Sequence, residues 1–255
     1  MDYKIDTSEM YFDCIDKAAC YTGNNSTNKT MQAMERPKVL KALLQWHDNI
    51  NILFKQLNTY DASSILIAEK NWMERNSFSK YMPSRNAPKK VLVGQVCTVD
   101  FGKTYKGEIG YIHPGLCIGK KENKYLVIPM TTGKKWRTSC YHPIQNPGAD
   151  KKCRQILTSE GFQREAVLLV SDMRFISGGR ILDLHEVIGG EVLDEIQRHA
   201  LGVAFPQLIR DYKSLQTENT KLHNKLKNME LKIKNLKQEI EIQENHIQDI
   251  PNEME

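Results

Sequence analysis

The middle of the chain holds five side chains whose combined chemistry suits the cleavage of a phosphodiester: His113, Thr131, Ser171, Asp172 and Arg174. An imidazole titrates near neutral pH, so it can take or give a proton, and a carboxyl group can assist. Hydroxyl groups and a guanidinium can donate hydrogen bonds to phosphate oxygens that gain negative charge. In RNA the 2′-hydroxyl supplies the nucleophile, so this chemistry needs no metal ion and no cofactor.

The same residues also have structural explanations that stay open at this point. A His-Pro pair and a Thr-Thr-Gly sequence after a strand are both common in turns. Arg174 could form an ion pair with Asp183 or Glu186 instead of contacting a phosphate.

Positive charge is concentrated between Lys89 and Arg137. This stretch has ten Lys and Arg and three acidic residues, a net +7, whereas the whole chain carries +5. Such a concentration indicates an anionic partner, most simply nucleic acid, although a solvated surface explains it equally well. Two basic loops also contain aromatic side chains, which could stack on unpaired bases or lie partly buried. The candidate nucleic-acid-binding residues are Lys103, Lys106, Lys134, Lys135, Arg137, Tyr105, Tyr111 and Trp136.

Cysteine usage predicts an intracellular protein without a metal site. The six cysteines are scattered without regular spacing, which is typical of reduced thiols in the cytoplasm. Cys140, His142 and Cys153 lack the second close pair that a structural zinc site requires. No apolar run approaches the roughly 20 residues of a membrane-spanning helix. The first residues also lack the basic and apolar regions of a secretory signal, so we expect a cytoplasmic protein with no membrane association.

The first third of the chain predicts an arm, two helices and a linker. Residues 1–36 show no apolar periodicity, which predicts a flexible N-terminal arm. Residues 37–76 repeat apolar side chains at helical spacing, which predicts a helical hairpin with Pro37 in its first turn. Residues 77–90 contain two prolines and an asparagine, which predict a linker.

Strand patterns follow in residues 91–205. Several short segments rich in β-branched residues, separated by turn residues, predict a small barrel or sandwich that ends in a helix from about residue 191. A low mean hydropathy of −0.53 for the 255 residues indicates an additional polar element.

Residues 206–250 are predicted to form a coiled coil, which is this polar element. Mostly apolar residues occupy the first and fourth positions of about six heptads, and Asn219 at a first position favours a parallel pair. Lys225 and Glu230 would attract each other across a parallel dimer, whereas Lys232 and Lys237 would repel. A homodimer is expected, and an antiparallel pair, a mixed partner or a lone solvated helix stay open.

Four segments occur in an order that is specific to one family. They are GQVCTVDF (94–101), GYIHPGLCI (110–118), LVIPMTT (126–132) and GFQREAVLLVSDMRFIS (161–177). Together they resemble the opening strand, the Gly-x-x-Arg-Pro entry, the threonine-ending strand and the arginine-ending segment of the MazF/PemK/Kid toxin ribonucleases. The resemblance extends over residues 94–205.

This resemblance implies a small SH3-like (MazF/PemK-like) β-barrel. With the helical hairpin before it and the long C-terminal coiled-coil helix after it, the predicted fold class is α+β. The resemblance also implies a dimer with an RNA groove, metal-independent cleavage of single-stranded RNA in a type II toxin–antitoxin system, and a cognate antitoxin. His113 stands where the family has a catalytic arginine, and Pro114 is retained. The histidine keeps acid–base chemistry but lacks an always-charged bidentate donor, a role that Arg174 could partly fill.

Two further functions stay open beside the nuclease. The barrel could be a catalytically inactive RNA- or protein-binding module with a coiled-coil oligomerisation tail, which His113 in place of arginine favours. DNA binding through the basic face is a third, weaker possibility.

Overall fold

The computed structural model describes residues 5–16, 20, 25–76, 80–81, 90–105, 107–133 and 137–248. The chain forms two compact units, Met1–Gly189 and Gly190–Glu255. The described helices of the first unit are α2 (Asn25–Thr30), α3 (Pro37–Gln56) and α4 (Thr59–Arg75). Its strands are β1 (Gln95–Asp100), β2 (Ile112–Lys121), β3 (Lys124–Thr131), β4 (Cys140–Tyr141), β5 (Asp150–Ile156), β6 (Ala166–Leu168), β7 (Arg174–Ser177) and β8 (Ile181–Val187).

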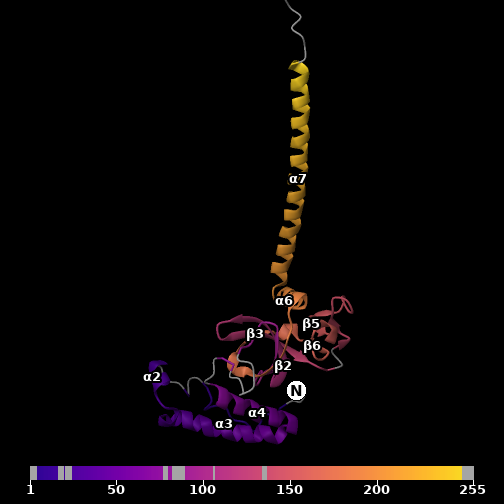
Figure 1. Ribbon diagram of the computed structural model, residues 1–255. Coiled ribbons are helices and arrows are strands. Elements are labelled where there is room, and N and C mark those ends of the chain that lie inside the picture. Colours follow the sequence, from indigo (N-terminus) through magenta and orange to yellow (C-terminus); the bar gives the residue numbers. More distant parts are fainter. Residues whose placement is uncertain are drawn as a thin grey trace, which may run out of the picture. The chain divides into compact units, whose positions relative to one another are not determined.

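Helices α3 and α4 occupy the stretch where the sequence predicts a helical hairpin. Pro37 stands in the first turn of α3, where its missing N–H is not needed. Leu57 is extended and ends α3, and the Asn58 side chain caps α4 by accepting a hydrogen bond from the Asp61 N–H at 2.9 Å. Figure 1 shows both helices on the same side of the strands.

The segment before Pro37 differs from the flexible arm that the sequence predicts. It contains α2, and part of it is hydrogen-bonded to α3 through the side-chain amides of Gln45, Asn49 and Gln56. At Tyr11, the backbone N–H donates to Asn49 Oδ1 at 3.0 Å, and Asn49 Nδ2 donates to the Tyr11 carbonyl at 2.5 Å. These contacts depend on tertiary structure, so no local sequence pattern reveals them.

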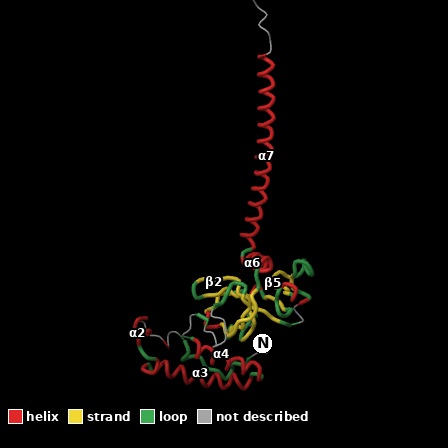
Figure 2. The backbone as a smooth tube through the Cα atoms, viewed as in Figure 1, coloured by secondary structure: helices red, strands yellow, loops and turns green. Residues whose placement is uncertain are grey.

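The eight strands form one sheet in the order β4-β5-β6-β3-β2-β1-β8, and β7 also pairs with β3. All pairs are antiparallel except β4 with β5. One edge of β3 is shared, because β7 pairs with its first half and β6 with its last residues. Figure 2 shows the strands gathered in one body next to the hairpin. The α+β class that the sequence predicts is confirmed.

Among the described residues the sheet is open, so the predicted closed barrel is not what the structure has. Closure would require β4 to pair with β8, but β4 is only two residues long and pairs with β5 alone. Along β8, exposed and partly buried residues alternate, as expected for a strand with one face in solvent.

A hydrophobic core covers one face of the central strands. It includes Cys97 and Val99 of β1, Cys117 of β2 and Val127 of β3, all with no exposed surface. Tyr81, from the predicted linker 77–90, is also buried in this core. Most of that linker (77–79 and 82–89) lies outside the described residues.

A disulfide joins Cys140 and Cys153, which corrects the prediction that all six cysteines are reduced. The parallel pairing of β4 with β5 brings the two Cα atoms within 5.1 Å, a separation that fits a disulfide. The sequence separation of 13 residues gives no sign of this pairing. The other four cysteines are free.

The second unit consists of α6 (Gly190–Ala204) and α7 (Pro206–Gln248). The heptad stretch is therefore one long helix, as the sequence predicts. Its described first- and fourth-position side chains are about half exposed or more, from Leu226 at 51% to Leu215 at 65%. In the described part of the chain, none of the helices has the combination of length and apolarity that crossing a bilayer requires.

Candidate active site

Strands β1, β2 and β3 position two of the predicted site residues. Val99 lies opposite His113 in the β1–β2 pair, and Gly115 lies opposite Pro129 in the β2–β3 pair. Continuing this second register by two residues on each strand brings Thr131 across from His113. Because opposed residues of an antiparallel pair project from the same face, the imidazole and the hydroxyl share one face of the sheet.

Strand β7 adds a third predicted residue to this face. It pairs with the other edge of β3, where Arg174 lies opposite Val127. Val127 and Thr131 are four residues apart on β3, so they project from the same side. At a rise of about 3.3 Å per residue, the separation along the strand is about 13 Å. Only long side chains or a bound substrate can bridge that gap.

The Arg174 side chain is folded under the loop that joins β1 to β2. Its Nη2 donates to the Ile109 carbonyl at 2.5 Å, and its guanidinium carbon lies 4.9 Å from the centroid of the Phe101 ring. Nη1 is 4.0 Å from the Glu108 carboxylate. Burial lowers the pKa of Arg174, and the negative charges of Glu108 and Asp172 oppose that shift.

Asp172 contacts the same residue, Ile109. Burial raises the pKa of its carboxyl group, and the Arg174 charge and a hydrogen bond from the Ile109 N–H act against this. Ile109 therefore has its N–H bound by Asp172 and its C=O bound by Arg174. The two side chains hold the β1–β2 loop, a role that sequence analysis did not assign to them. Ser171, in the 3-10 turn before Asp172, is exposed.

The base of the β1–β2 loop is closed by backbone hydrogen bonds. The Phe101 N–H donates to the Tyr111 carbonyl at 2.7 Å, and the Tyr111 N–H donates to the Gly102 carbonyl at 2.8 Å. Tyr111 has φ 61° and Gly102 has φ 74°. A non-glycine residue with positive φ is uncommon, and here it lets Tyr111 form both bonds.

His113 and Thr131 are both partly buried, on the same face of the sheet as the core residues Val99 and Val127. Burial lowers the pKa of the His113 imidazole, which favours its neutral form at neutral pH. The Thr131 hydroxyl oxygen accepts a long hydrogen bond of 3.4 Å from the Gly133 N–H, which leaves its proton available to donate.

Helix α4 lies against two of the predicted nucleic-acid-binding residues. Lys103 forms an ion pair with Glu69 of α4. Tyr111 is half-buried, and burial followed by the charges of Asp61 and Tyr60 raises its pKa. The structural alternative for Tyr111, a partly buried side chain, fits this environment.

The other candidates in the basic loops have different surroundings. Arg137 forms an ion pair with Glu165, with 2.7 Å between Nη1 and Oε2. Tyr105 is 86% exposed and available for stacking. The remaining candidates lie outside the described residues: Lys106, Lys134, Lys135 and Trp136.

Sequence analysis missed Arg180, which lies beside the candidate site. Its Nη1 donates to the Asp100 carbonyl at 3.0 Å, and its positive charge contributes to the lowered pKa of Arg174. The preceding Gly178–Gly179 pair is a visible turn signal, but the approach to Asp100 depends on the tertiary fold.

Metal-ligating residues do not gather in the part of the chain that the structure describes, where no three His, Cys, Asp or Glu side chains form a cluster. The Cys140 and Cys153 thiols are joined to each other. His142 uses Nδ1 to accept hydrogen bonds from the backbone N–H groups of Ile144 and Gln145.

A scan against protein-family models finds none that matches the chain, and a search of curated proteins also finds no match.

Proposed function

We propose that the protein is a MazF/PemK-type endoribonuclease that cleaves single-stranded RNA without a metal ion, as the toxin of a type II toxin–antitoxin system. The main support is that His113, Thr131 and Arg174 belong to neighbouring strands and share one face of the sheet. These three residues stand in three of the four segments that resemble the family. The proposal includes an SH3-like arrangement of the strands.

His113 is the proposed general base. Its neutral imidazole takes the proton from the ribose 2′-hydroxyl, and the 2′-oxygen then bonds to the adjacent phosphorus. The bond from phosphorus to the 5′-oxygen breaks, which leaves a 2′,3′-cyclic phosphate and a 5′-hydroxyl. The lowered pKa of His113 supports this role because a neutral imidazole can accept a proton at neutral pH.

The remaining groups are assigned two roles: stabilising negative charge on the phosphate and protonating the leaving oxygen. The Thr131 and Ser171 hydroxyls donate to the phosphate oxygens, and Arg174 contributes positive charge to the same group. Asp172 is the proposed general acid for the 5′-oxygen. Its raised pKa keeps a larger fraction of its carboxyl group protonated at a given pH than in an exposed carboxyl group, and only the protonated form can donate.

Partners and location follow from the same proposal. The exposed heptad face of α7 supports a homodimer through the coiled coil, to which the strands of the first unit would add a second contact. An antitoxin would hold the enzyme inactive by filling the RNA groove. The RNA substrate implies action in the cytoplasm.

The test is cleavage of single-stranded RNA by the purified full chain in EDTA. We expect 5′-hydroxyl and cyclic-phosphate ends, and a loss of about 100- to 10,000-fold in kcat/KM for His113→Ala. His47→Ala is the matched control, since this histidine is exposed on α3. Absence of cleavage by the wild-type chain, or equal activity of His113→Ala and His47→Ala, would contradict the assignment.

One observation favours the binding module as a second candidate. Asp172 and Arg174 both bond Ile109, which is an architectural role that requires no catalysis. In the same assay, tight RNA binding with intact RNA would support this module. Equal affinity for duplex DNA at matched salt would indicate binding by charge alone.

A further inference from the structure

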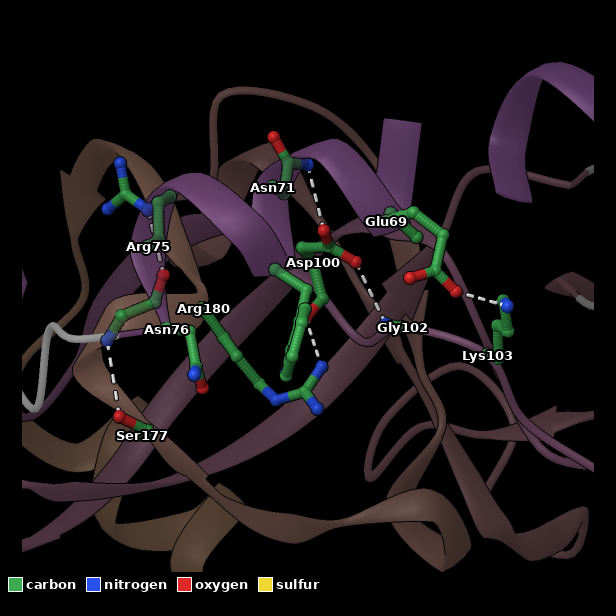
Figure 3. Close-up of a pocket in the computed structure, with 12 residues that line it drawn as sticks. Glu69, Asn71, Arg75, Asn76, Asp100, Gly102, Lys103, Ser177 and Arg180 are labelled. Atoms are coloured by element: carbon green, nitrogen blue, oxygen red, sulfur yellow. Dashed lines mark hydrogen bonds and ion pairs between the residues drawn. The ribbon is translucent and has the colours of Figure 1, made fainter. Parts of the chain in front are cut away.

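A pocket of about 530 Å³ lies between α4 and the turn that follows β1, and the 3-10 turn Gly178–Arg180 forms its third wall. Pockets of roughly 300 to 1,000 Å³ are typical of sites for small ligands and cofactors. Figure 3 shows that Asn71, Lys103 and Arg180 approach this region from three different elements. None of these elements forms the pocket alone.

Positive charge exceeds negative charge in the wall of the pocket. Its lining contains Arg75, Lys103 and Arg180, against the carboxylates of Glu69 and Asp100. The Asp100 carboxylate accepts hydrogen bonds from Asn71 Nδ2 at 2.8 Å and from the Gly102 N–H at 2.9 Å. Arg180 donates to the Asp100 carbonyl, which does not neutralise its guanidinium, whereas Lys103 is paired with Glu69. The pocket therefore favours an anionic group.

An exposed aromatic side chain lines the same pocket. Trp72 of α4 is 59% exposed, so its ring is accessible in the pocket. The side-chain amides of Asn71 and Asn76 are also in the lining. An aromatic ring for stacking, amides for hydrogen bonds and nearby cations are the groups that bind a nucleobase and its phosphate.

The pocket adjoins the candidate active site at Phe101, because its lining includes Asp100 and Gly102 on either side of this residue. The Arg174 guanidinium lies over the Phe101 ring. The Arg180 guanidinium approaches the next residue so closely that a Cβ on Gly102 would lie 2.8 Å from Nη1. The two cationic groups are therefore placed on consecutive residues of one turn. The charge of Arg180 also contributes to the lowered pKa of Arg174, which indicates that the two guanidinium groups lie near each other.

We propose that this pocket is a subsite for the nucleotide adjacent to the scissile phosphate of single-stranded RNA. Arg180 and Lys103 bind the phosphate of that nucleotide, and its base stacks on Trp72 with the Asn71 and Asn76 amides at its edge. The inference rests on the proposed nuclease function and assigns part of the RNA surface to α4. The helical hairpin then contributes to substrate binding.

The experiment compares RNA substrates of different length. A cleavable core oligonucleotide is extended by one nucleotide on its 5′ or 3′ side, and kcat/KM is measured for each with the full chain. One of the two extensions should raise kcat/KM by roughly tenfold or more, the range expected for one stacked base. Trp72→Ala should abolish this ratio, and Arg180→Gln should reduce it.

Trp46→Ala provides the matched control, because this tryptophan is exposed on α3 and does not line the pocket. The length ratio should be unchanged in this variant. The same ratio can be measured without catalysis, from dissociation constants for core and extended 2′-O-methyl oligonucleotides. A wild-type ratio that persists in both Trp72→Ala and Arg180→Gln would overturn the subsite.

The outcomes also separate the two proposals. If RNA is cleaved but the length ratio is the same in wild type and variants, the subsite is wrong and the nuclease stands. If extended 2′-O-methyl RNA binds with the predicted Trp72 dependence and no RNA is cleaved, the catalytic assignment fails and the pocket remains an RNA-binding site. Absence of any RNA binding would contradict both the nuclease and the subsite proposals.

Discussion

The first unit (Met1–Gly189, here called the strand unit) and the long helix α7 differ in how far their side chains are satisfied within the chain. In the first unit, a buried polar side chain such as Asn49 is bonded within the chain, in this case to both backbone groups of Tyr11. In α7, a row of apolar side chains lies in solvent, with Leu222 at 58% and Leu226 at 51% exposed. The first unit is complete by itself, whereas the second has a surface that a partner helix would bury.

This contrast separates what the two units contribute. Charged and titratable groups that act on a substrate need a fixed, partly dry environment, which a folded sheet supplies. A heptad surface supplies assembly and requires only a continuous helix. We therefore expect mutations in α7 to change oligomeric state and mutations in the strand unit to change stability and activity.

The largest expected effect concerns α7. Replacing Leu222 and Leu226 by Asp places four charges in the proposed dimer interface, which should raise the dimer dissociation constant by more than about 100-fold. Analytical ultracentrifugation of the full chain measures this change. Asn224→Asp with Asn228→Asp adds the same charge on the outer face and should leave the dimer intact. Equal behaviour of the two double variants would argue against the coiled coil.

The next effect tests packing in the strand unit at Gly178. A Cβ at this position would lie 2.5 Å from the Tyr81 backbone nitrogen and 2.7 Å from the Lys80 carbonyl carbon. Because backbone atoms cannot move aside cheaply, Gly178→Ala should lower the free energy of unfolding by about 2–3 kcal/mol in urea titration. Gly148→Ala, where nothing lies within 4 Å, should have little effect. A stable Gly178→Ala protein would mean that this contact is loose.

A smaller effect is expected where α3 binds the N-terminal segment. Asn49→Ala removes the two hydrogen bonds to Tyr11 and should lower the free energy of unfolding by about 1–2 kcal/mol. Limited proteolysis should also cut residues 5–16 faster in this variant. The exposed Asn51 on the same helix serves as the control, as Asn51→Ala should change neither measurement. Unchanged proteolysis in Asn49→Ala would show that the segment is held by other contacts.

The smallest effect is a pH dependence of stability through His113. Its pKa in the folded chain is below the ordinary value of about 6.5, so below that pH the unfolded chain binds a proton that the folded chain resists. Stability should therefore fall as the pH drops from about 6.5 through the folded pKa. Urea titrations at pH 7.5 and pH 5 should show a smaller fall for His113→Gln than for wild type. An identical fall in both would refute this assignment.

Local patterns predicted the elements whose signals are contained in one stretch of sequence. Pro37 with the following apolar repeat indicated α3, and the heptads from Leu208 onward indicated α7. The strands were indicated by β-branched segments such as 125–130. Each of these signals is a periodicity, and periodicity follows directly from helix or strand geometry.

Features that depend on long-range contacts could not be predicted in this way. The Cys140–Cys153 disulfide requires the parallel pairing of β4 with β5, and the bonds of α3 to residues 6–14 require tertiary docking. The predicted roles of Asp172 and Arg174 were incomplete for the same reason. Their bonds to Ile109 span more than 60 residues of sequence, so residue type suggested catalysis or an ion pair of Arg174 but not this contact.

In the proposed enzyme, the hydrogen bonds of Asp172 and Arg174 to Ile109 couple loop motion to substrate entry. A phosphate that recruits the Arg174 guanidinium competes with the Ile109 carbonyl for the same donor, Nη2. Releasing that carbonyl weakens the anchor of the segment before β2, which contains His113. Arrival of the anion would then be accompanied by rearrangement of the residues beside the base.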